Sequence, residues 1–285
     1  MNKLKEFLIQ FIKKRKQIKN DLNINKHLFD IKLKYKESVI IGNGPSLNSF
    51  FDKKINFLEE KNLFCVNSFI NSFFFLEYKP QYCIFVDPYY WKKNIPIQII
   101  EEFKTSIEIL NNEVDWELNL ILPDDARVWN WFIEIPNSNA NVKIIYFNNR
   151  SAGLNFDNSF FYNFSLYQKF PHFQNVLVAA LFFSINFGSE KNFLIGADMS
   201  LHEGIVVKNN QLCNKPNHFY DENYEIMPMF KDNGIDVFKI SEFFNALSMM
   251  FKGFEILEEY SKFKGAKVIN LTENSFIDSF ERRKI

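Results

Sequence analysis

Short apolar segments of three to six residues alternate with helical stretches from residue 38 onward. Polar or turn-forming residues bound each segment, which is typical of buried strands in a parallel sheet. The stretches 176–187 and 240–262 instead have apolar residues at helical spacing. This alternation predicts an α/β, Rossmann-like fold, with a mostly parallel, doubly wound sheet between two layers of helices. The predicted strands are 39–41, 63–66, 82–86, 118–122, 142–147, 192–195 and 266–270.

Two parts of the chain do not follow this alternation. Residues 201–236 fit neither the strand period nor the helix period, and they are too many for an ordinary loop. We therefore predict a lid over 201–236. The chain then divides into an N-terminal basic amphipathic helical segment, 1–37, and a Rossmann-like domain, 38–285, which includes the lid.

The N-terminal segment carries an excess of positive charge. The 34 basic and 34 acidic residues of the chain balance, but residues 1–37 hold eleven basic and four acidic side chains. Five of its apolar residues recur at three- and four-residue spacing, which predicts an amphipathic helix. They are Leu4, Phe7, Leu8, Phe11 and Ile12. Such a helix can bind an anionic membrane surface, or it can pack on its own domain or on another subunit; both alternatives stay open.

The overall composition excludes several classes of protein. A net charge of zero argues against a general nucleic-acid binder, and no stretch approaches the roughly twenty apolar residues of a membrane span. The three cysteines, Cys65, Cys83 and Cys213, show no CxxC spacing, which argues against a zinc site or a disulfide framework. We expect a cytoplasmic homo-oligomer without a signal peptide, held peripherally at the inner membrane face if the basic segment binds lipid.

The first predicted strand leads directly into residues 42–47, Gly-Asn-Gly-Pro-Ser-Leu. Glycines at the carboxyl end of such a strand let backbone amides approach a ligand, and the N-terminus of the next helix favours a phosphate. The segment is neither GxGxxG nor a P-loop, so it does not indicate an ordinary dinucleotide or ATP site. It predicts a nucleotide site of another kind, and a tight turn without a ligand is the alternative.

Polar residues also follow three other predicted strands. Asn67 follows the second, Asp87 the third, and Gly196 and Asp198 the strand at 192–195. Because parallel strands end at one edge of a sheet, we expect these residues to lie near 42–47 and to contact the ligand. Polar strand caps without function are the alternative.

Two of the four histidines, His202 and His218, lie in the predicted lid. A histidine there can accept a proton at physiological pH. Carboxylates and histidines of this region could also hold a metal, but their spacing is not that of a known metal site, so we predict none.

Taken in order, these motifs resemble the bacterial sialyltransferases of glycosyltransferase family 42. The resemblance extends from about residue 38 to residue 280 and is closest in the first motif. It is carried by 39–47, 66–69, 87–88, 149–150, 195–198, 268–270 and 274–275. It implies a Rossmann-like domain with a flexible lid, a CMP-activated sugar donor, metal-independent inverting transfer and a histidine base in the lid.

The resemblance implies a role for individual residues where the motifs match. Asp87 stands where the family has asparagine, and after Arg150 about twenty extra residues precede the helix, so Gln174 and Asn175 take the phosphate-facing place. The family's Tyr-x-x-His is absent, and 218–221 is its nearest counterpart, which makes His218 the first candidate base and His202 the second. The implied donor-binding residues are Asn43, Gly44, Pro45, Ser46, Asn67, Asp87, Arg150, Gln174, Asn175, Gly196 and Asp198.

The sequence therefore predicts a glycosyltransferase that moves a sialic-acid-like (nonulosonic) sugar from a CMP-sugar to a cell-surface glycan, such as lipooligosaccharide or capsule, without a metal or other cofactor. The Gly-Pro-Ser-Leu segment also resembles flagellin-glycosylation accessory factors and hydroxymethylpterin pyrophosphokinases. An ATP-dependent pyrophosphokinase, with Asp87, Asp198 and Asp221 around a divalent cation, is thus a second hypothesis. A non-catalytic glycan- or nucleotide-binding scaffold is the third.

Overall fold

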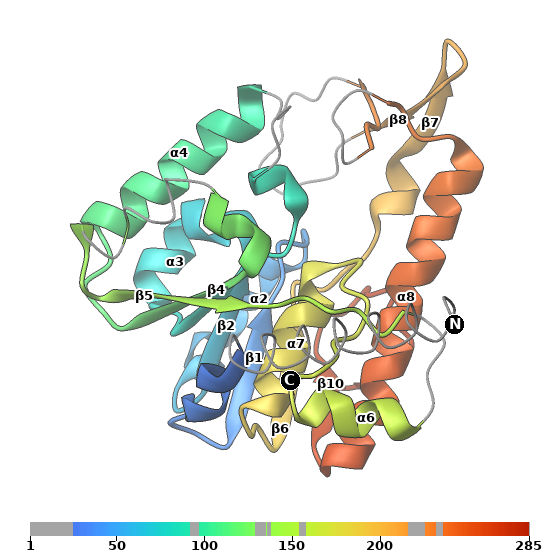
Figure 1. The fold of residues 1–285 in the computed structure, drawn as a ribbon. Helices are drawn as coiled ribbons and strands as arrows, with labels where there is room; N and C mark the ends of the chain where they lie inside the picture. Colours follow the sequence, from blue (N-terminus) through green and yellow to red (C-terminus); the bar gives the residue numbers. More distant parts are fainter. Residues whose placement is uncertain are drawn as a thin grey trace, which may run out of the picture.

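The computed structural model describes residues 25–91, 97–128, 135, 138–153, 158–215, 226–231 and 236–284. Within these ranges the large sheet has eight strands, all parallel to their neighbours (Figure 1). They are β1 (Glu37–Ile41), β2 (Asn62–Val66), β3 (Tyr82–Ile84), β4 (Leu118–Pro123), β5 (Val142–Phe147), β6 (Lys191–Ile195), β10 (Lys267–Asn270) and β11 (Glu281–Arg282).

The strand order confirms the predicted doubly wound sheet. In space the strands follow the order β11-β10-β6-β1-β2-β3-β4-β5, so the chain builds outward from β1 to β5 and then returns to the other side of β1 with β6. Ile41 at the end of β1 is in register with Cys65 on one side and Ile195 on the other. Cys65 is in turn in register with Cys83, so these two thiols lie on adjacent strands.

Helices cover both faces of the large sheet, and each face has its own apolar core (Figure 1). Alternate residues of β1 point to opposite faces, so Val39 and Ile41 join one core while Ile40 joins the other. The first core contains side chains of α2, α3 and α4; the second contains side chains of α6, α7 and α8. The helices are α2 (Leu47–Lys54), α3 (Phe73–Tyr78), α4 (Ile97–Asn112), α6 (Asn158–Ser165), α7 (Val176–Asn186) and α8 (Ile240–Lys264).

Helix α7 is the central element of the second core. Nine consecutive residues, 177–185, are buried, because this helix lies between the sheet and α8. A helix that is apolar all round is stable only when it is covered on all sides. Short 3-10 helices complete the connections: η1 (Lys26–Asp30), η2 (Ile55–Leu58), η3 (Asn67–Asn71), η4 (Pro88–Tyr90), η5 (Asp124–Val128) and η6 (Leu201–Gly204).

The predicted lid contains regular structure that the sequence reasoning missed. Strands β7 (Ile205–Lys208), β8 (Gln211–Asn214) and β9 (Met227–Pro228) form a small antiparallel sheet near one end of α8 (Figure 1). Asn209 and Asn210 connect β7 to β8 in left-handed conformations, with φ of 51° and 58°. This is the conformation of the two-residue turns that fit the twist of a hairpin, and asparagine adopts it readily.

The described part of the N-terminal segment packs against the domain. Residues 1–24, which include the predicted amphipathic helix, lie outside the described residues. The side-chain amide of Asn25 donates to the Tyr167 carbonyl at 2.9 Å and accepts from the Asn148 amide at 2.8 Å, and Leu28 is buried in the second core. Among the described residues, no helix combines the length and the apolar character needed to cross a membrane.

Candidate functional site

A cavity of about 270 Å³ lies at the carboxyl ends of β1, β2 and β6, and we call it the switch-point pocket. Open α/β sheets bind ligands where the strand order reverses, which in this sheet is beside β1. Six of the eleven predicted donor-binding residues line the cavity: Asn43, Gly44, Pro45, Asn67, Asn175 and Asp198. Apolar residues of β2, α7, η6 and α8 complete much of its wall: Val66, Val176, Leu177, Leu201 and Met250.

The glycines of the first motif hold two loops together. The amide of Gly42 donates to the Ile195 carbonyl and the amide of Gly44 to the Gly196 carbonyl, both at 2.8 Å. A Cβ atom on Gly42 would lie 2.3 Å from the Gly196 oxygen, and Gly196 itself has a φ of 61°. Contact between the loops after β1 and β6 therefore accounts for these glycines. The sequence reasoning had instead expected their amides to approach a ligand.

A carboxylate of the protein occupies the N-terminus of α2. Asp198 accepts hydrogen bonds from the Ser46 backbone amide at 3.2 Å and from the Ser46 hydroxyl at 2.8 Å. Burial raises the pKa of the Asp198 carboxyl, although the bonds from Ser46 lower it in part. A phosphate at this position would meet Asp198, so the start of α2 does not offer the open phosphate site that the sequence indicated. Ser46 and Gly196 line a neighbouring cavity of about 240 Å³ instead.

A second helix N-terminus, that of α7, opens on the switch-point pocket. Asn175 caps this helix, since its side-chain oxygen accepts from the Leu177 amide at 2.8 Å. Its Nδ2 lies 3.6 Å from the Met199 sulfur and 3.7 Å from the Met250 sulfur, which are weak acceptors. The positive end of the helix dipole and the amide donor of Asn175 thus favour an anionic group here. Lys215, also on the wall, adds a positive charge.

Other parts of the pocket wall carry acceptors without donors. The side-chain oxygens of Asn67 and Asn214 are buried and have no hydrogen-bond partner in the described part of the chain. Leaving a buried acceptor unpaired costs about 1–3 kcal/mol, so such atoms mark places where a ligand can donate. Asn67 and Met199 also have φ of 46° and 56°, the left-handed strain that is common at binding sites.

The predicted lid contributes to the pocket. Leu201, Gly204, Asn214 and Lys215 come from η6, from β8 and from the residue after β8. The placement of these residues agrees with a binding role for the insertion.

Of the two candidate bases, His202 lies among the described residues. His202 lies in η6, but its ring packs edge-on against Phe276, with 4.3 Å between the ring centres, and it does not line the pocket. Its Nδ1 is buried and has no hydrogen-bond partner among the residues described. His218 and Asp221 lie outside the described residues, so their roles stay predictions.

Besides Ser46 and Gly196, three predicted donor-binding residues do not line the pocket, and they do not line the neighbouring cavity either. Arg150 follows β5, which lies four strands from β1, or about 19 Å at the usual strand spacing. Its backbone is tied to Phe170 on that outer edge of the sheet. Asp87 follows β3, two strands from β1, and the side chain of Gln174 contacts the ring of His172 at 3.1 Å.

Sequence reasoning missed several residues of the pocket. Val66, Leu177 and Met250 have the apolar spacing of core residues, which carries no sign of a ligand. Asn214 and Lys215 lie in the segment 201–236, which fits neither the strand period nor the helix period. The pair Asn209 and Asn210 is the sequence signal there that indicates a hairpin. No group of three or more histidine, cysteine, aspartate or glutamate side chains that could hold a metal ion occurs in the described ranges.

Comparison with known proteins found only weak similarity. No protein family model matches the sequence, and no curated protein matches it either. A solved structure, the MAf glycosyltransferase from Magnetospirillum magneticum AMB-1, is similar with a TM-score of 0.48 and 11% sequence identity. The similar region covers 93% of this chain and 38% of that one. At this degree of similarity the activity of that protein does not transfer, and the Rossmann-like fold stands on the strand order described above.

Proposed function

We propose that this protein is a glycosyltransferase that moves a sialic-acid-like sugar from a CMP-activated donor to a cell-surface glycan. The observation that carries the proposal is that the wall of the switch-point pocket combines donors with unpaired acceptors. Asn175, the start of α7 and Lys215 supply donors and positive charge. Asn67 and Asn214 supply side-chain oxygens that have no partner among the described residues.

A nucleoside monophosphate has complementary groups. Its phosphate matches the start of α7, while the ribose hydroxyls and the exocyclic amine of cytosine can donate to the two asparagine oxygens. Val66, Leu177 and Met250 provide an apolar wall for the base and ribose.

The chemistry of the proposed reaction needs little beyond positioning. The acceptor oxygen forms a bond to the anomeric carbon from the face opposite the phosphate, and the carbon–oxygen bond to the phosphate breaks with its electron pair leaving on CMP. A histidine of the lid, His218 or His202, takes the acceptor proton. The α7 N-terminus stabilises the charge that develops on the departing phosphate, and binding in one pocket orients the reactants.

A panel of nucleotides tests the proposal directly. In a thermal-shift assay with CMP, UDP, GDP and ATP plus magnesium, we expect CMP to stabilise the protein most. Incubation with CMP-sialic acid and CMP-Kdo should then release CMP. Preferred stabilisation by ATP with magnesium would contradict the transferase and favour the pyrophosphokinase hypothesis. CMP binding without CMP release from any donor would favour a non-catalytic scaffold.

One substitution separates the phosphate contact from folding. Asn175→Asp keeps the cap of α7, because aspartate and asparagine are equivalent caps, but it replaces the amide donor by a negative charge. We expect CMP affinity to fall by about tenfold or more at unchanged stability. Asn245→Asp is a matched control, since Asn245 is exposed on α8 and its Nδ2 also faces a methionine sulfur, that of Met249, at 3.5 Å. Equal loss in both variants would reject the assignment.

The basic N-terminal segment belongs to the same proposal. Its lysines would hold the enzyme near a lipid-linked acceptor on an anionic membrane surface. Deletion of residues 1–20 should abolish binding to anionic liposomes while the melting temperature stays unchanged. Unchanged liposome binding would instead leave packing on the protein as the role of this segment.

A further inference from the structure

A further cavity, of about 480 Å³, adjoins the switch-point pocket at Asn43, and we call it the aromatic pocket. Its wall includes Leu47, Phe69, Phe73 and Phe74, together with Ser68 and Glu102. Asn43 lines both cavities, so the two lie on either side of this one residue after β1. A molecule in the aromatic pocket is thereby a neighbour of a molecule in the switch-point pocket.

The first two residues of α3, Phe73 and Phe74, differ in how far they are exposed. Phe74 packs against Phe51 and Tyr78, with 4.2 Å and 5.9 Å between ring centres, so its ring belongs to the core side of the wall. Phe73, the first residue of α3, is 76% exposed. This exposed ring borders the aromatic pocket, where it can contact a bound molecule.

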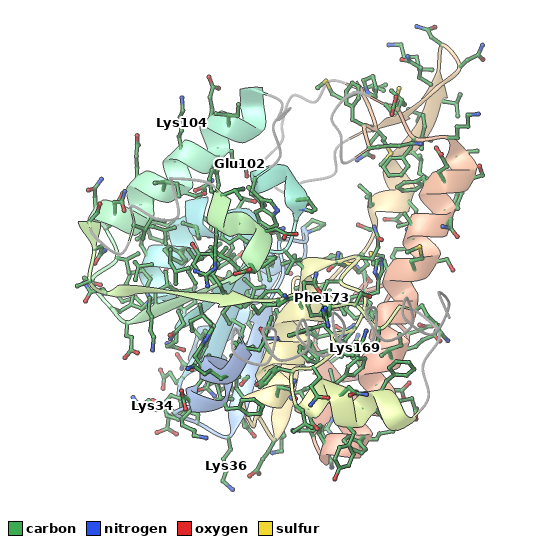
Figure 2. The ribbon with its side chains drawn as sticks, viewed as in Figure 1. Lys34, Lys36, Glu102, Lys104, Lys169 and Phe173 are labelled. Atoms are coloured by element: carbon green, nitrogen blue, oxygen red, sulfur yellow. The ribbon has the colours of Figure 1, made fainter. Side chains whose placement is uncertain are left out.

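Part of the wall, at Asn71 and Glu102, is held in place by hydrogen bonds. Asn71 donates to the Glu102 backbone carbonyl at 3.0 Å and accepts from the Ser106 hydroxyl at 2.8 Å, which fixes α4 against η3. Figure 2 shows Glu102 on α4, and the contact with Asn71 sets the position of its backbone. The pocket is therefore built on rigid elements rather than on a loose loop.

Two polar side chains of the aromatic pocket have no partner among the described residues. The Glu102 carboxylate and the Ser68 hydroxyl have no hydrogen-bond or ion-pair partner in the described part of the chain. None of the described residues on the wall is basic. The pocket thus joins an open aromatic face to a negative charge and a hydroxyl.

We propose that the aromatic pocket is the acceptor subsite and that it takes a neutral hexopyranose. One face of such a sugar presents C–H bonds that carry weak positive charge, which suits the negative face of the Phe73 ring. Its hydroxyls can donate to Glu102 and Ser68. A uronic or sialic acid would place its carboxylate near Glu102, so the pocket selects against an acidic terminal sugar. The proposal rests on the transferase function above, because Asn43 then lies between acceptor and donor.

Saturation-transfer NMR with simple glycosides tests this subsite on the full-length protein. The probes are the methyl β-glycosides of glucose, galactose and N-acetylglucosamine, and methyl β-glucuronide as the acidic match of the glucoside. We expect saturation transfer to at least one neutral glycoside, strongest at the protons of one ring face. The glucuronide should bind about tenfold more weakly. Binding of no neutral glycoside, or equal binding of glucoside and glucuronide, would overturn the proposal.

Variants locate the binding. Phe73→Ala should reduce neutral glycoside affinity by about tenfold, and the exposed position predicts an unchanged melting temperature. Tyr162→Ala is the control, because Tyr162 is 68% exposed on α6, away from both pockets. Glu102→Gln should reduce the difference in affinity between the methyl glucoside and the methyl glucuronide. Unchanged affinity in Phe73→Ala, together with unchanged discrimination in Glu102→Gln, would reject the subsite.

Nucleotide binding is scored separately in the same samples. If CMP binds and is released from its sugar but the glycoside results fail, the acceptor subsite is wrong and the transferase function stands. If CMP does not bind, the transferase function fails whatever the glycosides do.

Discussion

Strand β2 has an asparagine at each end, and the fold surrounds the two amides in opposite ways. Asn62 begins the strand and is 2% exposed. Its oxygen accepts from the amides of Lys34 and Tyr35, and its Nδ2 donates to Tyr35, Glu37 and Ser38. Asn67 follows the last residue of the strand, and its buried oxygen has no partner among the described residues.

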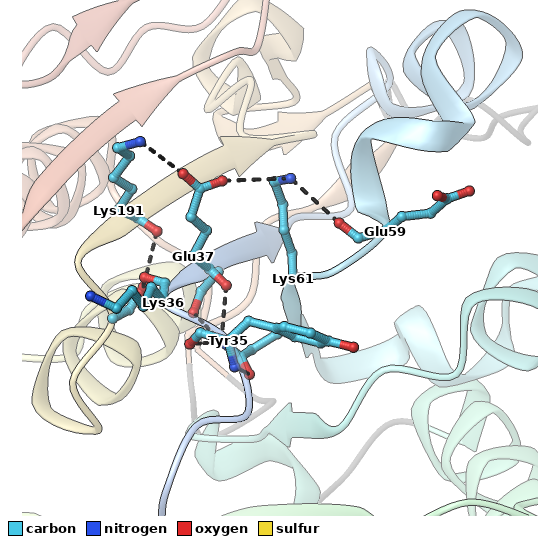
Figure 3. Close-up of polar contacts among 9 residues, drawn as sticks. Tyr35, Lys36, Glu37, Glu59, Lys61 and Lys191 are labelled. Carbon is cyan, nitrogen blue, oxygen red and sulfur yellow. Dashed lines mark hydrogen bonds and ion pairs between the residues drawn. The ribbon is translucent and has the colours of Figure 1, made fainter.

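The same contrast extends across the two edges of the sheet. At the amino edge, Figure 3 shows Glu37 between Lys191 and Lys61, at 2.8 Å and 3.5 Å. Polar groups there are paired by the protein itself. At the carboxyl edge the buried oxygen of Asn67 has no partner among the described residues, and burial raises the pKa of Asp198. The buried oxygen of Asn214, on the small sheet but also on the pocket wall, likewise has no partner among these residues. A residue type alone therefore does not indicate function; the end of the strand at which it lies, and whether the fold satisfies it, do.

The largest effect is expected from breaking the loop contact that builds the carboxyl edge. Gly42→Ala places a methyl group 2.3 Å from the Gly196 carbonyl oxygen, which is backbone and cannot turn away. We expect the free energy of unfolding to fall by about 4 kcal/mol or more in urea titration. Ser49→Ala, at an exposed position of α2, serves as control and should stay within about 0.5 kcal/mol of wild type. A small loss in Gly42→Ala would mean that the two loops can separate cheaply.

The amino-edge asparagine should matter for stability and not for the ligand. Asn62→Ala removes five hydrogen bonds and leaves their partly buried backbone partners near β1 and β2 without them. We expect unfolding free energy to drop by about 3 kcal/mol, with CMP affinity of the folded protein unchanged. A loss below about 1 kcal/mol would contradict the importance of this network.

The carboxyl-edge asparagine should show the reverse. Asn67→Gly removes the unpaired oxygen while accommodating the φ of 46° at this position. We expect unfolding free energy within about 1 kcal/mol of wild type and CMP affinity lower by about tenfold, measured by calorimetry. If stability falls and affinity does not, Asn67 is a structural residue and the contrast with Asn62 disappears.

The smallest effect is expected at the partly exposed ion pairs of Figure 3. The hydrogen bond from Lys191 is the main reason that the pKa of Glu37 is lowered in the fold. A lowered folded pKa stabilises the protein above the unfolded pKa, and this contribution disappears as the pH falls through the folded pKa. Glu37→Gln should therefore cost about 0.5 kcal/mol at pH 7, less at high salt, and nothing once the wild-type carboxyl is protonated. A difference that persists in acid would exclude the ion pair as its source.

Sequence reasoning predicted the large sheet well because its signal is local. The strand predicted over 142–147 coincides with β5, and the ends of the predicted helices lie within two residues of those of α7 and α8. The strand predicted over 82–86 ends at Ile84, although Phe85 and Val86 are still buried, because apolar runs do not show where pairing stops. The two-residue strand β11 has no pattern to read.

The site was harder to predict, because its geometry depends on which strand ends are neighbours. The predicted residues Asn43, Asn67 and Asp198 do line the pocket, because they follow β1 and its two neighbours, β2 and β6. Arg150 also follows a predicted strand, but that strand is β5, at the edge of the large sheet. The local sequence of a strand does not show its position in the strand order. The role of Asp198 at the start of α2 could not be predicted either. The hydrogen bond from the Ser46 hydroxyl to Asp198 joins residues far apart in the chain, and neither segment has a sequence pattern that indicates it.

The positions of the cysteines allow thiol labelling to report separately on the opening of the large sheet and of the small sheet. Cys65 and Cys83 lie side by side in the centre of the large sheet, while Cys213 lies in β8 of the small sheet, and all three are buried. A thiol reagent can reach the first pair only when the main core opens, whereas Cys213 becomes reactive when the small sheet opens. If the small sheet opens on its own, Cys213 reacts first, and a ligand that bridges Asn214 to the rest of the pocket would slow that reaction alone.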